Sequence, residues 1–148
     1  MREQIRPRRV RALLLAAAAA TTVLTALSGC TPSTVPDLER TAEPTDALPA
    51  GVQGFSGFDP DTTRHIASHR GIEFYLAKQT GDLATGLCLV VVKPVEPVQW
   101  ASSCSAAEYF GLQWDAGDVN AEFYRHGVTD DIVKSGWSQI SENVIVED

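Results

Sequence analysis

The sequence predicts an α+β fold: a small antiparallel β-sheet with one or two short helices, one disulfide and a disordered N-terminal tether. Residues 72–77 carry apolar side chains at alternate positions, as a strand with one buried face does. Residues 87–92 are apolar on both faces and rich in β-branched side chains, which is typical of a central strand. Ser105 and Glu108 have the spacing of a capping box, which predicts a short helix that Gly111 ends.

The other expected elements follow from turn residues between apolar segments. A strand over 64–68 precedes a turn at Gly71, and a third strand over 98–102 returns antiparallel to the second. In chain order, the rest are a hairpin of 112–115 and 119–124 turned at 116–118, a short helix within 129–136, and a strand pair at 137–140 and 144–146. This order of elements is that of an antiparallel α+β domain.

The N-terminal segment has the features of an export signal. Its arginines are Arg2, Arg6, Arg8, Arg9 and Arg11. They precede an apolar stretch at 12–26 and then the small residues of Leu27-Ser28-Gly29-Cys30. A basic region, a short apolar region and a small-residue cleavage site define a secretory signal. The apolar stretch is shorter than the roughly 20 residues that span a bilayer. An uncleaved membrane anchor and an ordinary secretory signal remain the alternatives.

Leu27-Ser28-Gly29-Cys30 resembles the lipobox of bacterial lipoprotein precursors. The resemblance implies that Cys30 receives a diacylglyceryl group with fatty acyl chains such as palmitate, and that cleavage after Gly29 makes Cys30 the new N-terminus. Two acyl chains anchor a protein stably, whereas one chain binds only marginally. The expected location is therefore the extracytoplasmic face of the cell membrane, with the lipid on Cys30 as the anchor.

Three regions are expected along the chain. Residues 1–29 form the lipoprotein signal peptide, 30–54 the lipidated cysteine and a flexible tether, and 55–148 a single extracytoplasmic α+β domain. The tether prediction depends on its prolines and its few apolar residues. These prolines are Pro32, Pro36, Pro44 and Pro49.

The expected mature chain is strongly acidic. Residues 30–148 contain seven basic and eighteen acidic residues, a formal charge of −11, whereas the whole sequence carries −7. Such a surface repels nucleic acids and anionic headgroups, so we expect no nucleic-acid partner.

Cys88 and Cys104 are expected to form a disulfide, because exported domains fold under oxidising conditions. The loop of about 15 residues that the bond would close corresponds to roughly 3 kcal/mol of stabilisation. A redox-active pair is the alternative. It lacks Cys-x-x-Cys spacing, although Cys104 precedes the expected helix, where a thiolate would be stabilised.

No motif in the sequence predicts catalysis, a metal site or a cofactor. His65 and His69 have a helical ligand spacing but lack the glutamate of a His-Glu-x-x-His motif, and His126 is expected in an exposed turn. The larger aromatic residues are expected to pack the core, with a ligand groove as the alternative. They are Tyr75, Trp100, Tyr109, Trp114 and Trp137.

Three short segments of the mature chain are similar to small lipoproteins of high-GC Gram-positive bacteria: Gly71-Ile72-Glu73-Phe74, Cys88-Leu89-Val90-Val91 and Ser103-Cys104-Ser105. This resemblance implies no particular activity. We expect a membrane-anchored, non-enzymatic binding or structural module of the cell envelope. The alternatives are a small extracytoplasmic enzyme that uses His65 or His69, and an accessory or inhibitory subunit that contacts an envelope protein.

Overall fold

Two antiparallel β-sheets make up most of the computed structural model, which describes residues 35–52, 57–81 and 85–148. In chain order the strands are β1 (Arg64–His69), β2 (Ile72–Lys78), β3 (Leu87–Lys93), β4 (Gln99–Ser105), β5 (Tyr109–Trp114), β6 (Val119–Tyr124), β7 (Trp137–Gln139) and β8 (Val144–Glu147). The helical segments are α1 (Pro36–Glu39), η1 (Pro44–Asp46), η2 (Pro60–Thr62) and η4 (Asp115–Gly117). The described fold is therefore more β than α+β, which corrects the predicted class.

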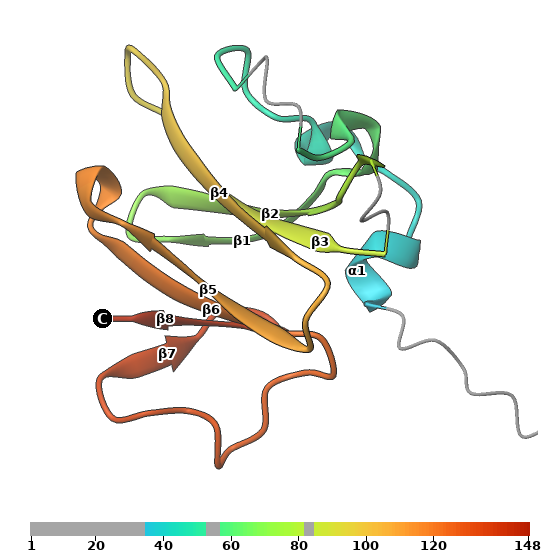
Figure 1. The fold of residues 1–148 in the computed structure, drawn as a ribbon. Coiled ribbons are helices and arrows are strands. Elements are labelled where there is room, and N and C mark those ends of the chain that lie inside the picture. The colour runs from blue at the N-terminus through green and yellow to red at the C-terminus, as the bar shows by residue number, and fades with distance from the viewer. Residues whose placement is uncertain (1–34, 53–56, 82–84) are drawn as a thin grey trace, which may run out of the picture. The chain divides into compact units, whose positions relative to one another are not determined.

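The first sheet has the strand order β1-β2-β3-β4 and the second has the order β5-β6-β8-β7 (Figure 1). Alternate side chains of both sheets meet in one buried apolar cluster. Phe74, Leu89 and Phe123 are among its largest fully buried members. The strands expected at 64–68, 72–77, 87–92 and 98–102 are confirmed as β1 to β4, and the last strand pair as β7 and β8.

The other face of the first sheet is also buried. Tyr75, Val90 and Val92 point to that side and pack against Val52 and Phe58, which precede β1 in the chain. This second cluster explains why residues 87–92 are apolar at every position, as the sequence analysis predicted for a central strand.

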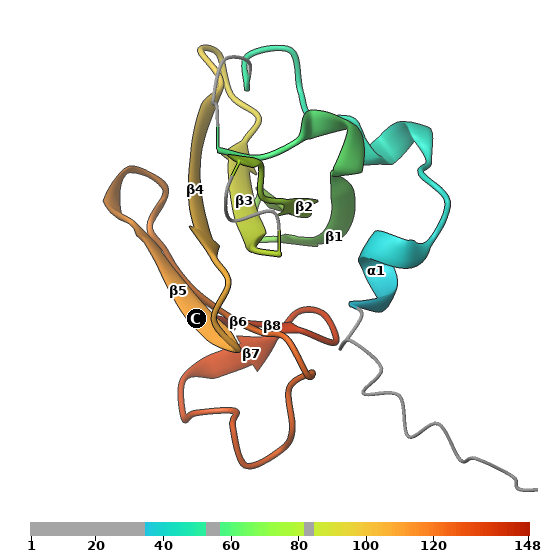
Figure 2. The same cartoon turned by 45° about the vertical axis from the view of Figure 1, so that its right-hand side comes forward.

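Residues 35–52, which we expected within the flexible tether, pack against the sheets instead. Val35 and Leu38 belong to the cluster between the sheets, and Val52 belongs to the cluster on the outer face. In Figure 2 the segment with α1 passes along the edge of the first sheet beside β1. The tether prediction is corrected for this range, whereas residues 30–34 and 53–54 lie outside the described part of the chain.

A buried carboxylate holds this segment in place. Asp46 is 2% exposed and accepts two hydrogen bonds from the Arg40 guanidinium, at 2.7 and 2.6 Å. It also accepts the backbone N–H of His65 in β1, at 2.8 Å. The hydrogen bonds from Arg40 lower the pKa of Asp46 well below its usual range, against the opposing effect of burial. The segment is thus fixed by polar contacts that its composition does not reveal.

The two helices expected in the second half of the chain are absent from the described residues. Ser105 ends β4, and its Oγ accepts the backbone N–H of Ala107 at 3.0 Å in a tight turn before β5. Gly111 lies within β5 rather than at a helix end. Residues 125–136 form turns between β6 and β7. The expected hairpin turned at 116–118 is confirmed as β5 and β6.

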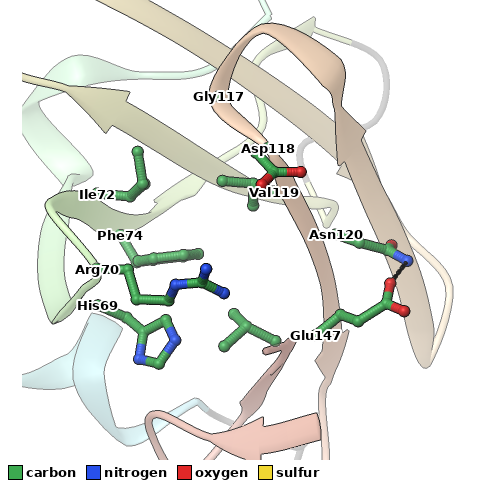
Figure 3. Close-up of a pocket in the computed structure, with 10 residues that line it drawn as sticks. His69, Arg70, Ile72, Phe74, Gly117, Asp118, Val119, Asn120 and Glu147 are labelled. Carbon is green, nitrogen blue, oxygen red and sulfur yellow. Dashed lines mark hydrogen bonds between the residues drawn. The ribbon is translucent and has the colours of Figure 1, made fainter. Parts of the chain in front are cut away.

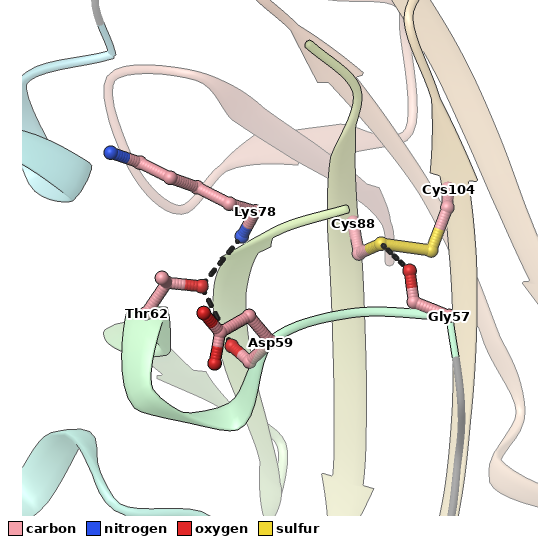
Figure 4. The surroundings of a disulfide bond; sticks show 6 residues. All are labelled: Gly57, Asp59, Thr62, Lys78, Cys88 and Cys104. Carbon is pink, nitrogen blue, oxygen red and sulfur yellow. Dashed lines mark hydrogen bonds between the residues drawn. A yellow bond between two sulfur atoms is a disulfide. The ribbon is translucent and has the colours of Figure 1, made fainter. Parts of the chain in front are cut away.

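The disulfide between Cys88 and Cys104 is confirmed. The two cysteines are directly paired across β3 and β4, with their Cα atoms 4.0 Å apart. Figure 4 shows the bond beside Gly57, whose carbonyl oxygen lies 3.8 Å from Cys88 Sγ. Nearby, Thr62 accepts the backbone N–H of Lys78, which joins η2 to the end of β2.

Candidate functional site

The strongest candidate site is a cavity of about 120 Å³ at one end of the two sheets, which we call the end cavity (Figure 3). It lies between the β1–β2 turn, the β5–β6 turn and the end of β8. Its floor is formed by the core residues Ile72, Phe74, Val119 and Val146, which are almost fully buried, and its border by His69, Arg70, Asp118, Asn120 and Glu147. The surface that the cavity offers is therefore mainly polar.

Two tight turns position the charged groups of the end cavity. Arg70 and Gly71 both have positive φ, 51° and 78°, as the two central residues of a type I′ hairpin turn do. Asp118 also has a positive φ of 52°. Asparagine, aspartate and glycine tolerate this conformation, whereas an arginine does so at a cost of about 1 kcal/mol. Arg70 is therefore a residue that local turn preferences do not explain.

Arg70 and Asp118 carry opposite charges on the same cavity, yet they form no ion pair with each other. Neither side chain makes a hydrogen bond or ion pair with any other residue in the described part of the chain. The neighbouring carboxylate of Glu147 is already occupied, because it accepts a hydrogen bond from Asn120 at 2.8 Å (Figure 3). Both residues are solvent-exposed, so water can solvate their charges at the border of the cavity.

His69 adds a third polar group to the end cavity. Its Nε2 atom is buried and has no hydrogen-bond partner among the described residues. The nearest carboxylate oxygen, Oδ1 of Asp148, is 3.7 Å away, which is too far for a hydrogen bond. Buried polar atoms are normally hydrogen-bonded, so this nitrogen is an exception among the described residues.

A second, more open hollow of about 340 Å³ continues from the end cavity. The two share Arg70, Asp118, Val119, Asn120 and Glu147. The second hollow is bordered in addition by Gln113, Trp114, Asp115 and Asp148. The carboxylates of this border outnumber the single arginine, so the surroundings favour a ligand whose net charge is neutral or positive.

His65 lies away from this cavity, on the outer face of the first sheet. Its Nε2 atom is 2.7 Å from a carboxylate oxygen of Glu73, and Ser68 donates a short hydrogen bond to the same oxygen. In a nucleophilic triad the imidazole lies between the hydroxyl and the carboxylate. Here all three groups touch one another, since Ser68 Oγ also lies 3.4 Å from His65 Nε2. None of the three residues lines either described cavity.

The structure does not bring His65 and His69 together as a pair of ligands. Among the described residues no group of three histidine, cysteine or acidic side chains could hold a metal ion. His126 is exposed, as expected for a turn residue, and lies against the carboxylate of Glu108. Acid–base catalysis uses a side chain that lies within hydrogen-bond reach of its partner groups. His65 contacts the carboxylate of Glu73 but lines neither described cavity, whereas His69 lines the end cavity but makes no hydrogen bond to a carboxylate.

The aromatic residues do not form a single groove. Tyr75 and Trp100 belong to the outer cluster of the first sheet, and Trp114 packs against the core. Tyr109 is 65% exposed and stacks on Tyr124 on the outer face of the second sheet. Burial and a hydrogen bond to Glu122 raise the pKa of Tyr124 to about 12.

Two parts of the predicted lipoprotein anchor fall outside the described residues: the apolar stretch at 12–26 and Cys30 itself. In the part of the chain that the structure does describe, no helix has the length and apolar character needed to cross a membrane.

The chain matches no protein-family model, and neither a curated protein nor a solved structure shows significant similarity to it.

Proposed function

We propose that this chain is a membrane-anchored extracytoplasmic lipoprotein that serves the cell envelope as a non-enzymatic binding module, with the end cavity as its binding site. The end cavity supports the binding role, because the exposed charges of Arg70 and Asp118 border one concave surface. Concave sites with a few convergent polar groups are the usual place for a small ligand.

The α1 segment and the end cavity lie at opposite ends of the first sheet. Lys78 at the end of β2 lies 3.8 Å from Glu39 of α1, whereas Ile72 at the start of β2 lines the end cavity. Figure 1 shows α1 and the β5–β6 turn on opposite sides of the molecule. A lipid near α1 would therefore leave the cavity directed away from the membrane.

The chain length between Cys30 and Val35 limits how far the proposed lipid can lie from the packed domain. Val35 is the first described residue and is 3% exposed. Five residue steps separate it from Cys30, and a fully extended chain covers about 3.5 Å per step, or about 18 Å in total. The proposed anchor would thus hold the α1 edge of the domain close to the lipid headgroups.

The anchoring part of the proposal is tested by metabolic labelling with a fatty-acid analogue in a bacterial host. The wild-type chain should incorporate the label and shorten by the signal peptide, and Cys30→Ala should do neither. A Cys88→Ala/Cys104→Ala variant is the matched control, because it removes cysteines that the proposal does not lipidate. Labelling of the Cys30→Ala variant at the wild-type level would contradict the anchor.

A small extracytoplasmic enzyme is the second candidate, favoured by the 2.7 Å contact between His65 and Glu73. It predicts turnover of a simple activated ester that is lost in His65→Gln. The binding-module proposal predicts no difference in ester hydrolysis between the wild type and this variant.

A further inference from the structure

We propose that two copies of this chain pair through their β4 strands, which joins the first sheets of both copies into one continuous antiparallel sheet. The inference goes beyond the proposed function, because none of the residues that line the end cavity lies on β4.

The two outer strands of the first sheet, β1 and β4, differ in how their free edges are covered. At β1 both backbone groups of His65 are occupied: its N–H donates to Asp46 at 2.8 Å, and its carbonyl oxygen accepts from Arg40 at 3.1 Å. The register of β1 with β2 also shifts between His65 and Ala67, as it does at a β-bulge. Covering segments and bulges are usual means by which proteins prevent a strand edge from pairing with another chain.

β4 lacks these protections in the described part of the chain. No backbone hydrogen bond joins Ser102 or Cys104 to any described residue outside β3. All seven residues of β4 pair with β3 without a register shift, and none of them is charged or a proline. None of them is buried either, whereas six of the seven residues of β3 are. A regular, uncharged edge of this kind can accept a further strand.

The register with β3 shows which groups of β4 point to the open edge. Cys88 and Cys104 lie directly opposite each other, with their Cα atoms 4.0 Å apart. Such a close approach is that of a non-hydrogen-bonded pair, since the Cα atoms of hydrogen-bonded pairs are about 5.5 Å apart. The N–H and C=O groups of Cys104 therefore point away from β3, as do those of Ser102, two residues earlier. These groups are the donors and acceptors of the proposed pairing.

The distribution of charge favours a second copy of the chain as the partner. Residues 98–114, which include β4 and β5, contain a single charged residue, Glu108. Figure 2 shows these two strands on the side of the domain opposite α1. Copies of a strongly acidic chain repel each other wherever their carboxylates meet, so they can approach most closely on this side. A basic partner would instead be attracted to the carboxylates elsewhere on the surface.

A two-fold axis at Ser102 gives the longest pairing of the two strands. Ser102 is the middle residue of β4, so this axis places all seven residues of each strand opposite residues of the other. Ser102 then lies opposite Ser102 of the second copy, and Cys104 lies opposite Trp100. The side chains at the axis are small and no like charges face each other along the strand, as a self-complementary contact requires.

Amide hydrogen exchange of the purified full chain in detergent micelles, measured by NMR, tests the pairing directly. In the dimer the N–H groups of Ser102 and Cys104 donate to the second copy, so their exchange should slow at least about tenfold as the protein concentration rises. The N–H groups of Ala101 and Ser103 point toward β3 and are the matched controls. They should be protected at every concentration.

Ser102→Lys tests the same edge by a change of charge. Two ammonium groups would face each other at the two-fold axis, so dimerisation measured by sedimentation equilibrium in a density-matched detergent should weaken at least about tenfold. The same change lowers the net negative charge of each copy, which by itself would favour association. Gln139→Lys, at an exposed position of β7, is the matched control and should dimerise like the wild type.

A wild type that is monomeric at every concentration would overturn the proposal. A dimer in which Ser102 and Cys104 still exchange fast would also overturn it, as would a folded Ser102→Lys variant that dimerises like the wild type. The exchange measurement needs no variant, so it decides the proposal even if Ser102→Lys does not fold.

Discussion

Arg70 has a positive φ of 51° in the exposed β1–β2 turn, a conformation that is disfavoured for arginine. Arg70→Asn should raise the free energy of unfolding by about 1 kcal/mol, because asparagine is favoured at positive φ in this turn. Denaturant unfolding of both proteins measures the effect, and a loss of stability in the variant would show that Arg70 has a structural role instead.

Asp46 makes the stability of the domain depend on acid. Its pKa in the folded chain is lowered, first by the hydrogen bonds from Arg40, below the value of about 3.9 for an unfolded aspartate. A lowered pKa stabilises the folded state fully above the unfolded pKa, and the stabilisation is lost as the pH falls through the folded pKa. We therefore expect unfolding free energy to decrease below about pH 4.

Asp46→Asn tests this explanation. It should lower the unfolding free energy at pH 7 by roughly 2–3 kcal/mol, since it breaks the pair with Arg40. Its stability should then change less than that of the wild type between pH 5 and pH 2. Asp130→Asn, at an exposed position, is the control. An unchanged acid dependence in Asp46→Asn would assign the effect to other carboxylates.

The disulfide joins two elements, β3 and β4, and closes a loop with a sequence separation of 16. Cys88→Ala/Cys104→Ala should lower the unfolding free energy by about 3 kcal/mol, because the unfolded chain gains the freedom of that loop. A reducing agent should destabilise the wild type by a similar amount and leave the variant unaffected. Equal stability of the two proteins without reductant would contradict the structural role of the bond.

The β5–β6 hairpin offers two glycines with opposite surroundings. A Cβ atom at Gly117 would approach the ring of Trp114 to 2.2 Å, whereas one at Gly111 would have no neighbour closer than 3.7 Å. Gly117→Ala should destabilise the domain by roughly 1–3 kcal/mol and shift its tryptophan fluorescence, since the ring must move. Gly111→Ala is the matched control and should be tolerated. Similar stability of both variants would show that the Trp114 ring moves aside at little cost in free energy.

The strands were predicted correctly where the pattern of apolar residues along the sequence matches the pattern of burial. The alternation at 72–77 and the doubly apolar residues at 87–92 are periodic signals that a sheet preserves. The predicted helix at 105–108 failed because Ser105 closes a turn with the same hydroxyl that would cap a helix. Residues 35–52 were missed because their docking depends on the contact of Asp46 with β1, which is distant in sequence.

The end cavity could not be predicted, because it is assembled from three segments that are far apart in the chain. The β1–β2 turn, the β5–β6 turn and the end of β8 meet only when the two sheets pack. The one local signal was Arg70-Gly71, since asparagine rather than arginine normally precedes glycine in such a turn. That departure indicates a position where local preference is subordinate to another role.

If Cys30 carries the lipid as proposed, the α1 edge of the domain should lie nearer the membrane than the β5–β6 turn at the end cavity. Fluorescence quenching measures this on the lipidated chain in vesicles that contain a quencher lipid. A fluorophore on Glu39→Cys should be quenched strongly, and one on Ala116→Cys in the β5–β6 turn should be quenched weakly. Equal quenching at the two positions, or stronger quenching at 116, would contradict the proposed orientation.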